Sequence, residues 1–525
     1  MRIQVILCGL GLGVGLVAGG CKPDGSQDTD PGTSEDDETG TCTPGAEGCL
    51  CGEDASCEPG LLCASNTCIP EDGVTTTSGT TPPGTASSET SGESSSPTET
   101  GGDSTGGTDT GGTECDPDMG LINPGCPDPM APYCEAGGTC VGCEALTCSD
   151  VSTATPTCDL ATGYCEQCTA TDVAACVGTT PVCDVAASKC IGCSDHVDCK
   201  DSACQFDTGA CYATALYVDR GADCANADGS AELPYCEIAD AAAKLGAEPT
   251  AILVKPSPQP YTEQVQIATG RTVGIVRNGS GTVKLEVATF DAINISDGAT
   301  VQVSALQISK GDVTKGLFCS GAKVSIDHTQ IIDRTGLGIE GITCDLTLRD
   351  SRVWRNIAGG IKVNGGTLRL ENTYVVTNGG SFSAVSGLLI SNAATVDAVY
   401  TTIADNDGTN TVADSIECTA AGAVKLRNSI VFGKTPDGSV DCAGATATTS
   451  VIDSAMLTGE GNVMQAALDA SWFVAPEAGN FAIKVGPPFK DVAIWIAGDP
   501  SQDYDGNMRP TRDGKKDYAG ADRPN

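Results

Sequence analysis

The sequence predicts an all-β protein with a parallel β-helix in its C-terminal half, preceded by small disulfide-rich repeats and disordered linkers. Three observations lead to this prediction. Apolar residues recur every 22 to 28 residues after position 301, the cysteines between 115 and 211 fall into groups of four, and long N-terminal stretches contain mainly small and polar residues. Recurrence at such intervals is typical of stacked solenoid coils rather than of one large core.

The first twenty residues are predicted to direct export. Arg2 precedes an apolar stretch from Val5 to Val17, and the small residues Ala18, Gly19 and Gly20 come directly before Cys21. This arrangement resembles a bacterial lipoprotein signal, in which the cysteine is acylated and becomes the new N-terminus. The resemblance implies a signal peptide over 1–20 and a lipid on Cys21 that anchors the chain at the outer membrane or cell surface. An ordinary signal peptide with an unmodified Cys21 is the alternative.

Four segments of different composition follow the signal. Residues 21–41 form an acidic tether, 42–70 a knob with six cysteines, 71–114 a linker rich in Thr, Ser and Gly, and 115–211 four cysteine-rich repeats. The tether and the linker contain too few apolar residues to bury a core, so we expect both to be disordered. A knob this short depends on its disulfides.

The chain has 30 cysteines, and 28 remain once Cys8 of the signal and Cys21 are set aside. Such a density persists only where disulfides form, which predicts an exported protein. Successive groups join through Cys-x-x-Cys pairs, and Cys140, Cys165 and Cys190 follow one another at 25 residues. Zinc also uses this spacing, but an even count in an exported chain favours disulfides, with the pairing inside each group left open. The region resembles cysteine-rich repeats in exported proteins of myxobacteria, which implies a stalk or interaction module.

The segment before the coils is predicted to hold a strand at 215–218, a loop at 221–229, a short helix at 234–245 and a strand from 251. Two apolar series five residues apart then set the register of the coils. The first is Val303, Ile326, Leu348, Leu370, Ala398 and Leu426, and the second is Ile308, Ile331, Val353, Val375, Ile403 and Val431. We therefore expect a β-helix over 212–440, with further coils and a cap over 441–525.

Stacking places equivalent residues about 4.8 Å apart in neighbouring coils, so polar residues at one repeated position should form ladders. Asn356, Asn378 and Asn406 predict an internal amide ladder. A hydroxyl ladder is expected from Thr329, Ser351, Thr373, Thr401 and Ser429, and outward ion pairs from Asp327, Arg349 and Glu371. Cysteines close to one coil apart predict the disulfides Cys319–Cys344 and Cys418–Cys442, and a third, Cys224–Cys236, would fasten the helix to its loop.

Taken together, this half of the chain resembles the right-handed parallel β-helix family with pectate-lyase-like coils. Its closing segments, residues 503–510 and 517–522, are similar to the endings of many exported bacterial β-helix proteins. The resemblance implies two kinds of active site. One is a lyase site with carboxylate-bound calcium and an Arg or Lys base, and the other is a hydrolase site with several aspartates and a histidine. The Gly-His-Gly and Arg-x-Lys motifs of the second kind are absent.

For a lyase, Asp333, Arg355 and Asp405 share one outward position in different coils. Charged residues on an exposed solenoid face are ordinarily only solvated, and His328 is expected to be a solvent-facing structural residue. Residues 503–506 resemble part of a calcium loop, but Ser501 and Arg512 stand where an EF-hand has Asp and Glu, so we expect a hydrogen-bonded turn. No cofactor is expected, and calcium binding is left as an open alternative.

The composition limits the classes of molecule that the protein is expected to bind. A net charge of -40 argues against nucleic-acid binding, which needs Lys and Arg to displace counterions. The order of anchor, spacer, stalk and β-helix predicts a cell-surface binding or structural protein, with polysaccharide or cell-envelope components as partners. The coil aromatics Trp354, Tyr374 and Tyr400 are the candidates for stacking on sugar rings. The alternative is a polysaccharide lyase or glycoside hydrolase with a divergent site.

Overall fold

The computed structural model describes residues 61–64, 67–70, 126, 128–135 and 138–524, apart from 381–382, 409–410, 421, 436–437 and 487. The chain divides into two units, 1–107 and 108–525. In the first, β1 (Leu61–Ala64) pairs antiparallel with β2 (Thr67–Pro70). The signal, the acidic tether, Cys21 and the Thr/Ser/Gly-rich linker lie outside the described residues. Within the described part, no helix is long and apolar enough to cross a bilayer.

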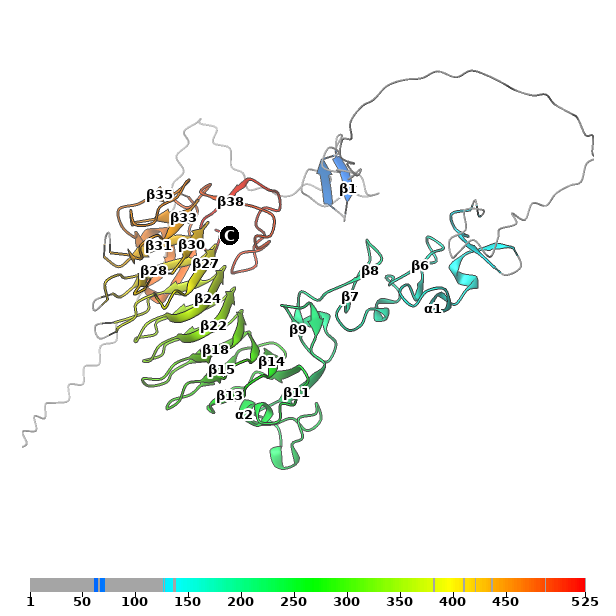
Figure 1. The fold of residues 1–525 in the computed structure, drawn as a ribbon, viewed down its shortest axis with the longest axis horizontal. Coiled ribbons are helices and arrows are strands. Elements are labelled where there is room, and N and C mark those ends of the chain that lie inside the picture. The colour runs from blue at the N-terminus through cyan, green and yellow to red at the C-terminus, as the bar shows by residue number, and fades with distance from the viewer. Residues whose placement is uncertain are drawn as a thin grey trace, which may run out of the picture. The chain divides into compact units, whose positions relative to one another are not determined.

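The second unit contains a right-handed parallel β-helix whose coils contribute strands to three parallel lines (Figure 1). Line 1 comprises β11 (Thr214–Val218), β12 (Thr250–Val254), β14 (Thr272–Arg277), β17 (Thr300–Ser304), β20 (Lys323–Asp327), the second halves of β22 (Ile339–Arg349) and β24 (Ile361–Glu371), β27 (Thr395–Val399), β30 (Val424–Arg427) and β33 (Thr446–Thr448). Line 2 comprises β15 (Val283–Glu286), β18 (Leu306–Ser309), β21 (Gln330–Ile332), β23 (Arg352–Trp354), β25 (Tyr374–Val376), β28 (Thr402–Asn406), β31 (Ile430–Gly433), β34 (Val451–Ile452) and β35 (Val463–Met464). Line 3 comprises β13 (Val265–Ile267), β16 (Ile293–Ile295), β19 (Leu317–Ser320), the first halves of β22 and β24, β26 (Leu388–Ser391), β29 (Ile416–Cys418) and β32 (Val440–Asp441).

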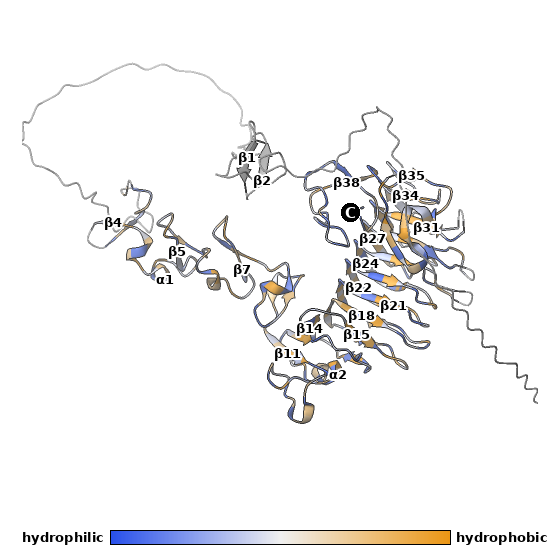
Figure 2. Ribbon diagram, turned by 180° about the vertical axis from the view of Figure 1, so that it is seen from behind, coloured by the Kyte–Doolittle hydropathy of each residue, from blue (hydrophilic) through white to orange (hydrophobic). Residues whose placement is uncertain are grey.

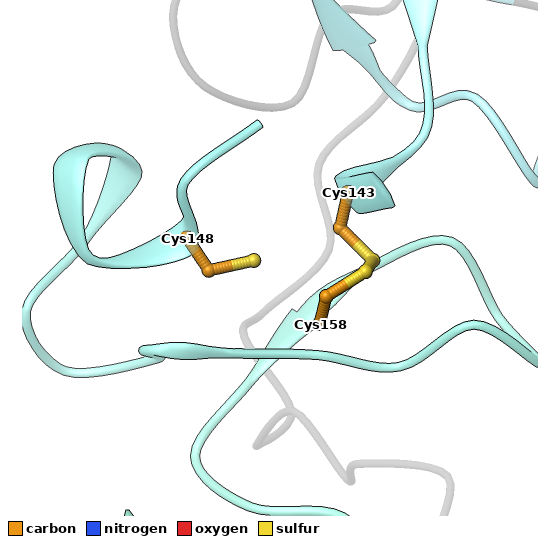
Figure 3. Close-up of side chains that lie close together, drawn as sticks. All are labelled: Cys143, Cys148 and Cys158. Atoms are coloured by element: carbon orange, nitrogen blue, oxygen red, sulfur yellow. A yellow bond between two sulfur atoms is a disulfide. The ribbon is translucent and has the colours of Figure 1, made fainter. Parts of the chain in front are cut away.

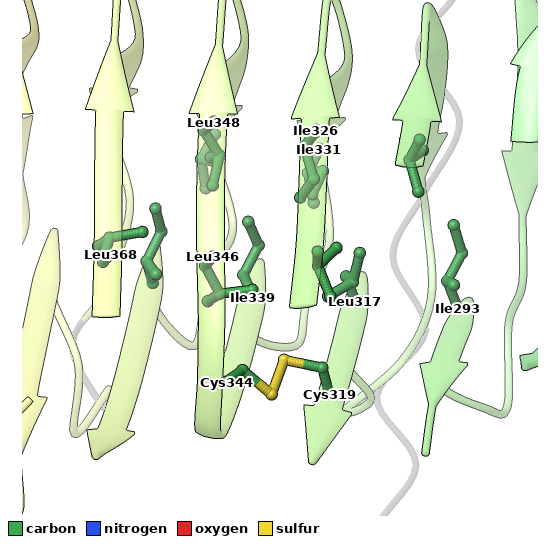
Figure 4. Packing of buried hydrophobic residues seen from close by; sticks show 14 of the residues in the cluster. Ile293, Leu317, Cys319, Ile326, Ile331, Ile339, Cys344, Leu346, Leu348 and Leu368 are labelled. Carbon is green, nitrogen blue, oxygen red and sulfur yellow. A yellow bond between two sulfur atoms is a disulfide. The ribbon is translucent and has the colours of Figure 1, made fainter. Parts of the chain in front are cut away.

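The register of the coils is the one that the apolar repeat predicts. Val303 pairs with Ile326, Ile326 with Leu348, and the series continues without a slip to Leu426. Because side chains alternate across a strand, this register points one apolar row inward in every coil. The rows from the three lines meet inside the helix as one continuous core (Figure 4).

The turn between lines 1 and 2 repeats in each coil. One residue there adopts a left-handed backbone, with φ of 47° at His328, 46° at Asp350 and 44° at Asn372. The next residue turns its hydroxyl inward, so that the Ser351 Oγ accepts from the Thr329 N–H at 3.2 Å and the Ser429 Oγ from the Thr401 N–H at 3.2 Å. These buried hydroxyls satisfy turn N–H groups that no strand can pair.

The cysteine repeats are a series of small hairpins. They are β3 (Tyr133–Cys134) with β4 (Cys140–Val141), β5 (Thr157–Cys158) with β6 (Cys165–Glu166), β7 (Val182–Asp184) with β8 (Lys189–Ile191), and β9 (Cys204–Gln205) with β10 (Ala210–Cys211). Short helical turns lie between them, namely η4 (Cys143–Ala145), α1 (Cys148–Val151), η5 (Val173–Ala175) and η6 (His196–Asp198). In the last three repeats the first cysteine bonds the third and the second bonds the fourth, as in Cys143–Cys158 and Cys148–Cys165. Such a number of disulfides indicates an exported or extracellular protein.

The N-terminal end of the β-helix is covered by α2 (Ile238–Ala242), and a disulfide joins Cys224 of η7 (Cys224–Asn226) to Cys236, two residues before α2. The predicted helix over 234–245 is wrong in length, because only five residues are helical. Ile238 and Ala242 are buried against the first coils as the pattern indicates. Residues before Ile238 run as loop, and one turn suffices to cover the end of the core.

The C-terminal segment folds back over the outer face of line 2, where Figure 2 shows hydrophobic residues around β31 and β34. It contains η8 (Ala470–Trp472), β36 (Phe473–Ala475), η9 (Pro476–Ala478), β37 (Asn480–Ile483), β38 (Ala493–Trp495) and β39 (Lys515–Asp517). Tyr374 is 1% exposed and Tyr400 0% under this cover. The expectation that these tyrosines stack on sugar rings is therefore wrong, and a site must lie elsewhere.

Candidate functional site

The three candidate lyase residues do not form one site. The Arg355 Nε donates to the Asp333 Oδ1 at 2.5 Å, and the Arg355 guanidinium lies 3.9 Å from the centre of the Trp354 ring. Asp405 accepts from Thr377 at 3.4 Å. Thr377 occupies the stack between Arg355 and Asp405, because each coil adds one residue at this position. Arg355 is thus engaged as a cation with Asp333, and Asp405 lies two coils further on.

The predicted ladder asparagines and coil cysteines bond to one another between neighbouring coils, as structural residues do. The Asn356 Nδ2 donates to the Asn378 Oδ1 at 3.0 Å, and the Asn378 Nδ2 to the Asn406 Oδ1 at 3.1 Å, with all three side chains buried. Arg334 takes the equivalent position in the preceding coil, where burial lowers its pKa to about 10. A disulfide joins Cys319 to Cys344 in neighbouring coils (Figure 4). A second disulfide joins Cys418 to Cys442, also in neighbouring coils.

The cysteine clusters are built for disulfides rather than zinc. Among the described residues, three groups of three cysteines bring their sulfur atoms within 4.8 Å of one another, and Cys143, Cys148 and Cys158 form one of them. Figure 3 shows the Cys143–Cys158 bond within this group, and Cys148 bonds Cys165. A sulfur in a disulfide carries no thiolate to bind zinc.

The calcium-like loop is a turn held by its own hydrogen bonds. The Asp503 Oδ1 accepts from the N–H groups of Asp505 at 3.0 Å and Asn507 at 2.7 Å. The Asp503 Oδ2 accepts from the Asn507 Nδ2 at 3.1 Å and the Arg523 N–H at 2.9 Å. Both oxygens of the Asp503 carboxylate therefore already accept hydrogen bonds from the protein itself.

An open groove of about 570 Å³ lies on the outer face of line 3, beside α2. Its polar lining residues are Gln264, Gln266, Thr269, Arg271, Asn294 and Ser296, and alanines of the α2 segment also line it. Gln266 and Asn294 pair in register between β13 and β16, so their amides are stacked one coil apart. The sequence signal was the alternation of these amides with buried Val265, Ile267, Ile293 and Ile295. Among the residues that the structure describes, no carboxylate or histidine lines this groove.

A second feature collects both histidines of the chain around one aspartate. Asp327 is 3% exposed; its Oδ2 accepts from the Ser304 hydroxyl and lies 3.5 Å from the His328 Nδ1. The His196 Nε2 lies 2.8 Å from the Ser304 Oγ, and the Cys204 N–H donates to the His196 Nδ1. This pattern assigns the proton of neutral His196 to Nε2, so His196 donates to Ser304 and cannot serve as its base.

The same buried aspartate corrects one expectation. Asp327 is not an outward partner of Arg349, which instead lies 3.7 Å from Glu371. His328 is exposed, but it lines an acidic cleft of about 440 Å³ together with Asp350, Glu371 and residues 500–506. The hydrogen bond that His328 donates to the Asp327 carboxylate raises the pKa of His328, and burial raises the pKa of Asp350 to about 6. No local pattern foretold this cleft, because its parts come from distant segments.

Comparisons with known proteins add little beyond the fold. Residues 99–217 match a family of unknown function (DUF8331). No curated protein matches the chain. The chain is similar to a solved pectate lyase, Pel9A, at 13% identity over 59% of this chain and 96% of that one, with a TM-score of 0.35. It is also similar to an alginate lyase from Paenibacillus sp. str. FPU-7, at 15% identity over 48% and 92% with a TM-score of 0.33. A rhamnogalacturonan lyase matches at 10% identity over 58% and 96%, with a TM-score of 0.32.

Proposed function

We propose that this chain is a cell-surface protein that binds neutral polysaccharide in the amide-lined groove beside α2. The observation that carries the proposal is the stacked pair Gln266 and Asn294 in a groove whose described lining residues include no carboxylate or histidine. A carboxamide both donates and accepts hydrogen bonds, as a sugar hydroxyl does. A lipid on Cys21, in the segment outside the described residues, would hold the protein at the membrane.

Electrostatics favour a neutral ligand over a uronate polymer. The chain carries a net charge of -40, and this field repels polyanions. In the described part of the chain, the groove has one cation, Arg271, whose guanidinium already donates to the Gly246 carbonyl. A polysaccharide that lies across several coils would meet amides at the coil spacing instead of paired cations.

Replacing Gln266 and Asn294 together with Ala is expected to weaken binding of a neutral glucan about 10-fold. A hydrogen bond contributes about 0.5–1.5 kcal/mol, and two are removed. Binding of the full oxidised chain to soluble neutral glucans and to polygalacturonate would be measured by calorimetry, with product size followed in parallel. Gln307→Ala is the matched control, since Gln307 is a half-buried amide on line 2, away from the groove. Unchanged affinity in the double variant, or binding of polygalacturonate alone, would refute the proposal.

Glycoside hydrolysis in the acidic cleft is a second candidate function. Burial raises the pKa of Asp350 to about 6, so this carboxyl keeps its proton in mildly acidic solution, below pH 6, as a general acid must, and other carboxylates line the same cleft. Shortened products from neutral glucans, lost in Asp350→Asn, would favour this function over passive binding.

Asp350→Asn is also expected to stabilise the fold at pH 8 and to have little effect at pH 3.5. Burial raises the pKa of Asp350 from 3.8 to about 6, so the folded state holds this proton more tightly than the unfolded state. The resulting stability is present below pH 3.8 and is lost as the pH rises through 6. Asparagine tolerates the left-handed backbone at this position. Thermal melts would show a rise in Tm of a few degrees at pH 8, and exposed Asp397→Asn should show none.

A further inference from the structure

A third cavity, of about 310 Å³, lies where the last cysteine repeat packs on the outer face of line 1. The Tyr212 ring covers Gly274 so closely that a Cβ there would lie 2.6 Å from its Cε2. The Phe206 N–H donates to the Gln302 Oε1 at 3.4 Å, and Lys323 pairs with Asp207 at 2.9 Å. These contacts fix the repeat against β17 and β20 and leave the cavity between them.

The lining of the cavity is polar and electrically balanced. Hydroxyls and amides come from Gln205, Thr208, Thr272, Thr300, Gln302 and Ser325, while Tyr212 and Pro249 supply apolar surface. Lys323, the one cation among the described lining residues, is neutralised by Asp207. Several hydroxyl and amide groups beside a ring match a small polyhydroxylated molecule, and the volume is at the lower end of ligand pockets, roughly 300–1,000 Å³.

One buried group in this lining lacks a partner. Ser325 is 7% exposed, and its Oγ makes no hydrogen bond within the described part of the chain. A buried hydroxyl without a partner costs about 1–3 kcal/mol, so the site gains when a ligand hydroxyl reaches it. The wall opposite is preorganised, because the disulfides Cys193–Cys204 and Cys199–Cys211 hold the repeat rigid.

We infer that this cavity binds one neutral sugar unit, of monosaccharide size, between the last cysteine repeat and the β-helix. The inference goes beyond the proposed polysaccharide groove, which lies on another face and shares no lining residue with this cavity. A chain end carrying such a unit would be held by the repeat and the β-helix together.

Ligand-observed NMR on the full oxidised chain would test this with D-glucose, D-galactose, D-mannose and D-galacturonate as probes. At least one neutral sugar should give a saturation-transfer signal that exceeds that of galacturonate. Ser325→Val, which removes the hydroxyl, and Thr208→Trp, which fills the cavity from its exposed rim, should each weaken binding about 10-fold or more.

Two controls make the result specific. Thr347→Val removes a hydroxyl at the same register position one coil further on, outside the cavity, and should bind like the unaltered chain. The Gln266→Ala, Asn294→Ala variant should also retain sugar binding, whatever it does to the groove. The inference is overturned if no neutral sugar binds, or if Ser325→Val and Thr208→Trp bind as the unaltered chain does.

Discussion

Arg509→Met is expected to release the C-terminal segment from the β-helix. The Arg509 and Asp517 side chains are both 0% exposed and pair at 3.0 Å. Arg509 also donates to the Asn372 Oδ1 at 3.1 Å and lies 3.8 Å from the centre of the Tyr400 ring, so it ties the segment to the coils. Without Arg509 the buried Asp517 carboxylate keeps only Arg523, whose partly exposed side chain places its Nε 3.0 Å from the Asp517 Oδ1. The expected cost is therefore about 3 kcal/mol, the lower end of the range for a broken buried ion pair.

Hydrogen exchange would locate this effect, because opening should be confined to 473–521 and the outer face of line 2. Loss of the cover exposes Phe432 and Tyr374, so the variant should also become more sensitive to protease and more prone to aggregate. Arg512→Met is the matched control, since Arg512 is exposed. Equal exchange in the two variants would show that the buried pair does not hold the segment.

Asn378→Ala is expected to destabilise the middle coils by about 3 kcal/mol. The Asn378 Oδ1 accepts two hydrogen bonds from Asn356, one from the backbone N–H at 3.2 Å and one from the side-chain Nδ2 at 3.0 Å. The Asn378 Nδ2 donates to the Val353 carbonyl at 2.9 Å and to Asn406 at 3.1 Å. Truncation leaves these buried groups without partners, and each orphaned group costs about 1–3 kcal/mol.

The neighbouring Thr377→Ala serves as the control, because the Thr377 side chain points away from the core and makes one long hydrogen bond, 3.4 Å, to Asp405. Since a solenoid need not unfold in one step, exchange of amides in β23, β25 and β28 is a better readout than one global midpoint. If these amides exchange alike in both variants, the ladder contributes nothing to coil stability.

The coil architecture could be predicted from the sequence because coil contacts are local and periodic. Residues 22 to 28 positions apart stack on each other, so the spacing of apolar residues fixes which atoms meet. The same regularity places Asn356 over Asn378 and Cys319 beside Cys344. An inward polar residue forms hydrogen bonds with the residue at the same position in the next coil. The register of the apolar residues therefore also predicts these polar pairs.

Contacts between segments outside the coil repeat could be identified only from the tertiary structure. His196 and Asp327 meet because the last cysteine repeat docks on line 1, and nothing in their spacing indicates it. Tyr374 and Tyr400 are buried because the C-terminal segment covers line 2. Arg355 has an outward position, as predicted, but its charge is paired with Asp333. The sequence by itself determined the stacked coils and the exported, disulfide-rich character, since both follow from local spacing and composition. Which surfaces remain exposed to solvent depends on how segments far apart in the sequence pack together. That packing results from many weak contacts, and no local sequence pattern indicates it.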